Sequence, residues 1–197
     1  MEKTLFKHKW NSYFFISFVG IIAGFLVAFF SQFPSDDLWG LSFFSSENIG
    51  FWMFTSSLIA LFSSKHYTAG INVALYVFFM FYITVIFKQL TLVNEGYNML
   101  EHFCNYWWQD ILYGLIPAFV CFFLAFVLWF GRKNKLIFVF LRFAPILFIL
   151  TEAIINWFGV INRNQGLFMA IVDTACAIGY LLIILKESNF KNRKQQC

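Results

Sequence analysis

Long apolar runs alternate with short polar segments along the whole chain. Six of these runs reach or approach the roughly twenty apolar residues that a helix needs to cross a lipid bilayer. The predicted helices cover residues 12–31, 49–64, 68–87, 111–130, 136–158 and 166–185. The pattern predicts an all-α fold, a polytopic integral membrane bundle of about six transmembrane helices that forms a single transmembrane domain over residues 1–197.

The hydrophobic pattern allows more than one structure for two stretches. The run from 49 to 62 holds only about fourteen apolar residues, so its helix is expected to begin within 41–46 or to lie obliquely in the bilayer. The longest connection, 88–110, carries acidic residues and a cluster of Tyr and Trp, which are typical of the membrane interface. We expect it to form an amphipathic helix on the outer surface or a lid over a cavity.

Composition and charge agree with a membrane location. Hydrophobic residues make up 60% of the chain and charged residues only 12%, against roughly 25% charged residues in soluble domains. With the N-terminus on one side of six helices, eleven of the fourteen Lys and Arg residues fall on that side. The positive-inside rule then predicts a multi-pass protein of the cytoplasmic membrane with both termini cytoplasmic.

The same charge distribution limits the partners of the chain. The net charge of +4 comes from basic residues beside the ends of apolar runs. We therefore expect these residues to contact the lipid bilayer and not nucleic acid. The four cysteines form no C-x-x-C pair and no zinc-type spacing, and no hydrolase, P-loop or dinucleotide motif occurs. We therefore assign no metal, no cofactor and no catalytic residue, and we favour a protein that is not an enzyme over a motif-poor membrane enzyme.

Small residues spaced four apart predict close helix packing. Gly20, Gly24 and Ala28 fall on one face of the first predicted helix, an arrangement that lets a neighbouring helix approach. Ala170 in the last helix is assigned the same role. Their neighbour is either another helix of this chain or, in a rival hypothesis, a partner protein.

Three charged residues interrupt the apolar runs, at Arg142, Glu152 and Asp173. Ionisable groups inside a membrane are costly and usually mark a site. From the polar link 159–165, Glu152 lies about seven residues back and Asp173 about eight residues on, so two antiparallel helices would bring the carboxyls to similar depth. We predict a ligand-binding site of Glu152, Asp173 and Asn156, with Arg142 as a further candidate.

The two carboxyls allow two readings. If they face each other, they should share a proton or bind a cation, which suits a proton relay or an amine-bearing substrate. Otherwise each is a protonated, hydrogen-bonded packing group. Arg142 either reaches back to the cytoplasmic interface or contacts an anion in a cytoplasm-facing vestibule together with Asn72.

Our preferred hypothesis is a transport-type or ligand-binding membrane subunit with its site between the last two helices. The alternatives are a non-catalytic membrane subunit, such as an immunity, sensor or assembly factor, and a motif-poor membrane enzyme. The six-helix layout is similar to that of the substrate-binding membrane subunits of vitamin-type importers, in topology alone. That similarity implies a separate energising subunit, because no nucleotide-binding motif is present.

Overall fold

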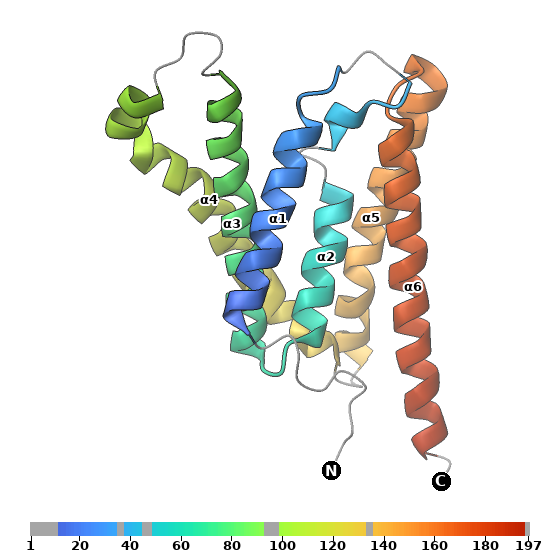
Figure 1. The fold of residues 1–197 in the computed structure, drawn as a ribbon. Helices are drawn as coiled ribbons and strands as arrows, with labels where there is room; N and C mark the ends of the chain where they lie inside the picture. Colours follow the sequence, from blue (N-terminus) through green and yellow to red (C-terminus); the bar gives the residue numbers. More distant parts are fainter. Residues whose placement is uncertain (1–11, 35–37, 45–48, 93–98, 133–135, 196–197) are drawn as a thin grey trace.

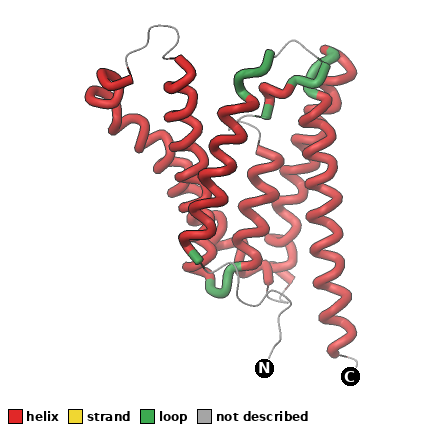
Figure 2. Tube along the Cα trace, in the orientation of Figure 1, coloured by secondary structure: helices red, strands yellow, loops and turns green. Residues whose placement is uncertain are grey.

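All regular structure in the described part of the chain is helical, which confirms the all-α fold (Figure 2). The computed structural model describes residues 12–34, 38–44, 49–92, 99–132 and 136–195. Its helices are α1 (Tyr13–Phe30), η1 (Leu41–Phe43), α2 (Ile49–Phe62), α3 (His66–Leu92), α4 (Met99–Trp129), η3 (Phe130–Arg132), α5 (Leu136–Arg163) and α6 (Leu167–Gln195). Every α-helix except α2 is long and apolar enough to cross a membrane, so the chain is a multi-pass membrane protein.

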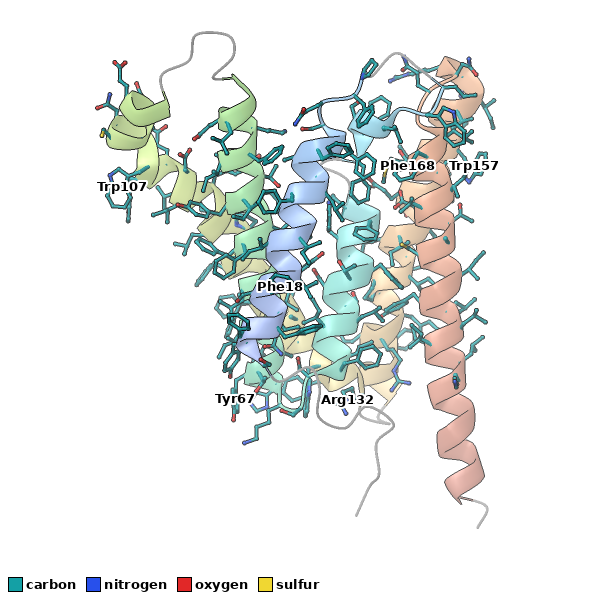
Figure 3. All side chains as sticks on the ribbon, in the orientation of Figure 1. Phe18, Tyr67, Trp107, Arg132, Trp157 and Phe168 are labelled. Carbon is teal, nitrogen blue, oxygen red and sulfur yellow. The ribbon has the colours of Figure 1, made fainter. Side chains whose placement is uncertain are left out.

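Helix α2 is the centre of the bundle and contacts α3, α4, α5 and α6 (Figure 1). On one side of it, α1 and α4 both pack against α3, and on the other side α5 and α6 pack against each other. The first turns of α4 stand away from the other helices, and Trp107 points outward from them (Figure 3). The bundle therefore consists of two groups of helices joined by α2.

The two ends of the bundle differ in what they hold. The upper end in Figure 1, named here the α5–α6 end, holds η1 and the link between α5 and α6. The lower end, named the α2–α3 end, holds the start of α1, the link between α2 and α3 and the end of α6. Helix α1 thus begins, and α6 ends, at the same end of the bundle. Lys3, Lys7 and Lys9 and residues 133–135, which entered the orientation argument, lie outside the described residues.

The connection predicted at 88–110 is largely helical, which corrects the expected boundaries. Helix α3 continues to Leu92 and α4 already begins at Met99. The polar residues of this region hold the two helices together: Gln89 donates from Nε2 to both carboxyl oxygens of Asp110 at 3.1 Å. These polar side chains satisfy each other's hydrogen bonds between α3 and α4. Their presence in the sequence therefore does not mark the ends of the helices.

The link between the last two helices is also shorter than the sequence pattern indicated. Helix α5 runs to Arg163 and α6 begins at Leu167, where residues 159–165 were expected to be the link. The chain turns at two residues with left-handed backbone, Asn164 (φ 53°) and Gly166 (φ 82°), a conformation that ends helices. Gly159 lies inside α5, because a single glycine weakens a helix by only about 1 kcal/mol.

The small residues that were predicted to pack closely do so within the helical bundle of this chain. A Cβ atom at Gly20 would lie 2.6 Å from the Tyr76 carbonyl oxygen, and one at Gly24 would lie 2.6 Å from the Met80 carbonyl oxygen. Ala28 and Ala170 are fully buried. The Gly20–Gly24 face of α1 is thus occupied by α3 and is not a free surface for a partner protein.

Helix α2 is too short to cross the hydrocarbon layer, and its ends are satisfied by neighbouring helices. Fourteen residues span about 21 Å, against about 30 Å of hydrocarbon, and its upper end lies below those of α1, α5 and α6 (Figure 1). Just past its C-terminus, the carbonyl oxygen of Ser63 accepts from Trp129 Nε1 at 3.0 Å and from Arg132 Nη1 at 2.7 Å. A cation at a helix C-terminus complements the helix dipole.

Candidate functional site

The candidate site begins with a buried hydrogen bond between the last two helices. Asn156 of α5 donates from Nδ2 to Oδ2 of Asp173 of α6 at 2.7 Å. Asp173 is fully buried. A buried carboxyl needs such partners, because an unsatisfied polar group in an apolar interior is costly.

The greater length of α5 explains why Asn156 meets Asp173. With the link at 164–166, Asn156 lies eight residues before it and Asp173 seven residues after it, whereas Glu152 lies twelve residues before it. Four residues of helix correspond to about 6 Å. The sequence therefore predicted the wrong partner for Asp173 by one helical turn: Glu152 was expected at its depth, and Asn156 lies there.

The Asp173 carboxyl also lies against the first turn of α2. A Cβ atom at Gly50 would lie 2.7 Å from the Asp173 carboxyl carbon, so only glycine leaves room for this carboxyl. An acidic side chain close to a helix N-terminus is favourable, because the backbone N–H groups there give it a partial positive charge. The acidic residue thus complements one end of the short helix as Arg132 complements the other.

A second hydrogen bond fixes the register of α5 against α6. Trp157 donates from Nε1 to Oγ1 of Thr174 at 3.0 Å, and that hydroxyl donates to the Ala170 carbonyl oxygen at 2.7 Å. Trp157 and Thr174 directly follow Asn156 and Asp173 in the chain. Two adjacent cross-helix bonds therefore define how the helices face each other.

A cavity of about 610 Å³ opens beside this pair at the α5–α6 end of the bundle. Its polar lining comes from α5 and the link that follows it: Asn156, Asn162, Arg163 and Gln165. Its apolar lining includes Phe43 of η1 and Phe158 of α5. Asn156 is thus both a wall of the cavity and the partner of Asp173.

The segment after α1 brings Phe43 to this cavity. Two backbone N–H groups at the start of α6 donate to carbonyl oxygens of this segment. Leu167 donates to Leu38 at 3.0 Å, and Phe168 donates to Trp39 at 3.1 Å. Figure 3 shows Phe168 and Trp157 toward this upper end of the bundle. Gly40 follows with left-handed backbone, and a Cβ atom there would lie 2.8 Å from the backbone nitrogen of Gly166.

Glu152 lies one helical turn before Asn156 on α5 and is half-buried. The hydrogen bond that ties Asp173 to α5 comes from Asn156. A shared proton or cation between Glu152 and Asp173 stays a prediction.

Arg142 lies away from these residues, at the α2–α3 end. It is buried, and it donates from Nε and Nη2 to the Gly131 carbonyl oxygen at 3.0 and 2.8 Å. Tyr180 of α6 donates to the backbone carbonyl of Arg142 at 3.1 Å. Asn72 instead donates to the Ser63 hydroxyl at 3.0 Å. The structure therefore does not bring Arg142 to Asp173 and Asn156, and it gives Arg142 and Asn72 separate hydrogen-bond partners.

Several residues of the site were not predicted from the sequence. Asn162, Arg163 and Gln165 were placed in a polar link, and Phe43 and Gly50 drew no attention. The helical spacing of Asn156, Gly159 and Arg163, at i, i+3 and i+7, would have revealed a common face. That signal requires α5 to continue past Gly159.

Among the described residues, no group of three or more His, Cys, Asp or Glu side chains could hold a metal ion. No known family model, curated protein or solved structure matches this chain. The arrangement itself offers hydrogen-bond donors and acceptors, one cationic side chain and an apolar wall.

Proposed function

We propose that this chain is a ligand-binding membrane protein of the transport type, and that its site is the cavity at the α5–α6 end. The observation that carries the proposal is the double role of Asn156, which lines the cavity and donates to the buried Asp173. Intramembrane acidic residues are rare and usually functional. A ligand in the cavity would contact the same side chain that binds the acid.

The chemistry of the lining indicates the class of ligand. Because the Asn156 nitrogen donates to Asp173, its amide oxygen is the atom left to accept a hydrogen bond from the cavity. Arg163 at the rim supplies a positive charge, and Phe43 and Phe158 supply apolar surface. These groups favour a small molecule that carries an amine or amide donor, an anionic or strongly accepting group and an apolar part.

Orientation and partners complete the proposal. The excess of Lys and Arg beside alternate ends of the apolar runs supports a cytoplasmic-membrane protein whose α2–α3 end faces the cytoplasm. The cavity then faces outward. Movement of the ligand across the membrane would depend on an energising subunit, since no nucleotide-binding motif occurs in the sequence.

An untargeted search for bound small molecules tests this proposal. The full chain is purified in lipid nanodiscs, and the small molecules that remain bound are identified by mass spectrometry. We expect at least one compound to be enriched with the native chain and depleted about tenfold or more with Asn156→Ala, because that variant removes the hydrogen-bond acceptor.

Two further variants make the result interpretable. Asn105→Ala changes an exposed asparagine of α4 and should retain the compound. Asn162→Ala changes another cavity residue without touching the Asn156–Asp173 bond, so it separates lost binding from lost folding. Equal enrichment in all four proteins, or no enriched compound in any, would contradict the proposal and favour the subunit hypothesis.

A further inference from the structure

A second cavity, of about 200 Å³, lies between α2, α3 and α4. Its rim includes Ile49 and Leu124, which are both more than half exposed, and its floor includes Val73 and Met80, which are fully buried. The cavity therefore extends from the surface of the transmembrane helices into the core. It shares no lining residue with the first cavity among the described residues.

One polar side chain in this cavity is unsatisfied. Ser57 is 1% exposed and lines the cavity, and its hydroxyl has no hydrogen-bond partner among the described residues. Other hydroxyls of the same region bond to the preceding turn, as Thr55 does to the Phe51 carbonyl at 3.1 Å and Ser63 to the Ile59 carbonyl at 2.8 Å. A buried hydroxyl without a partner is destabilising, because it has lost its hydrogen bonds to water and gained none in the protein.

We infer that this cavity binds an apolar, membrane-dissolved molecule whose carbonyl group accepts a hydrogen bond from Ser57. A carbonyl satisfies the hydroxyl proton and brings no unsatisfied N–H or O–H group of its own into the hydrocarbon layer. Apart from Ser56, the remaining lining is mainly apolar, with Trp52, Met53 and Leu128 among its members. A dry cavity of about 150 Å³ holds benzene, so this one has room for a single ring with a short substituent.

The ligand enters from the bilayer and not from water. The rim residue Leu124 belongs to an exposed apolar face of α4 that also presents Val120 and Phe123. This face belongs to a helix that is long and apolar enough to cross the membrane, where its neighbours are lipid chains. The site thus differs from the first one in position, route of entry and ligand chemistry.

A matched pair of probes tests the inference. Acetophenone carries the carbonyl group, and α-methylstyrene has nearly the same shape without it. The dissociation constants of both probes are measured with the purified full chain in detergent. We expect the affinity ratio of acetophenone to α-methylstyrene to be about tenfold higher with the native chain than with Ser57→Ala. Comparing the two proteins cancels the different partitioning of the probes into micelles.

A spectroscopic measurement and a control variant complete the test. Carbonyl-labelled [¹³C]acetophenone should show a downfield carbonyl resonance when bound to the native chain, and this shift should be absent with Ser57→Ala. Ser64→Ala changes an exposed serine of the link between α2 and α3 that does not line this cavity, and it should behave like the native chain. An unchanged ratio with Ser57→Ala, a loss confined to Ser64→Ala, or no saturable binding of either probe would overturn the inference.

Discussion

One N–H group of the Asn156 amide is committed to Asp173, which leaves the amide oxygen and the second N–H for other partners. The bond to Asp173 restrains the orientation of the amide and therefore the position of its oxygen. The adjacent bond from Trp157 to Thr174 holds the backbone that carries it. In the proposed function, ligand specificity at the scale of single residues would therefore depend on Asp173, which orients the Asn156 amide.

Gly50 gives the sharpest prediction at this scale. Gly50→Ala places a Cβ atom against the Asp173 carboxyl, and such overpacking costs about 1–3 kcal/mol, more than the roughly 1 kcal/mol that alanine gains in a helix. We expect a lower midpoint of thermal unfolding. Gly179→Ala is the matched control, because its added Cβ atom would lie 3.7 Å from the nearest atom of the Phe54 ring, at ordinary contact distance.

A double variant separates the clash from other effects of Gly50→Ala. In an Asp173→Ala background the added methyl group has no carboxyl to meet, so Gly50→Ala should no longer lower the unfolding midpoint. The same loss in both backgrounds would show that Asp173 does not lie against the start of α2.

The candidate site was partly predictable from its residues. The cost of Asp173 inside an apolar run marked it as a site residue, and Asn156 was named because it lies near Glu152. Their pairing could not be predicted, because it depends on the rotation of two helices and on the exact length of the link. The left-handed backbone at Asn164, which sets that length, leaves only a weak trace in the sequence.

At the scale of elements, the short helix α2 depends on charges supplied by other helices. Arg132 and Trp129 donate to the carbonyl of Ser63, and the Arg132 guanidinium also lies 5.4 Å from the centre of the Trp129 ring. Figure 3 shows Arg132 at the lower end of the bundle, away from the α5–α6 end. In a helix too short to reach the membrane interface, such contacts replace water at its ends.

Arg132→Met is expected to destabilise the protein while keeping most of the side-chain volume. The Ser63 carbonyl keeps its bond from Trp129, so the loss should be about 1–2 kcal/mol, measured as a lower resistance to thermal or detergent-induced unfolding. Arg163→Met removes an exposed arginine and should change stability little. Equal stability of both variants would mean that Arg132 does not support the end of α2.

The helices themselves were predictable in number and order, but less so in extent. Apolar runs locate the part of a helix inside the bilayer, and the expected ranges fall inside or close to the observed helices. They do not report where a helix continues into polar sequence, as α5 does to Arg163 and α6 does to Gln195. Backbone hydrogen bonds favour continuation of the helix there, whatever the polarity of its side chains.

At the scale of the whole molecule, α2 joins two groups of helices and lies beside both proposed sites. The first cavity lies toward α5 and α6 and the second between α2, α3 and α4. Gly50 and Ser57, on the same helix, belong to these separate sites. A displacement of α2 would therefore affect both.

The most direct test of the account is the structure of the full chain saturated with the compound that co-purifies with it, determined with a bound antibody fragment. We predict that the compound lies in the cavity between Phe43 and Arg163 and that its donor group contacts the amide oxygen of Asn156. An empty cavity in the saturated protein, or the same compound found elsewhere in the bundle, would contradict the account.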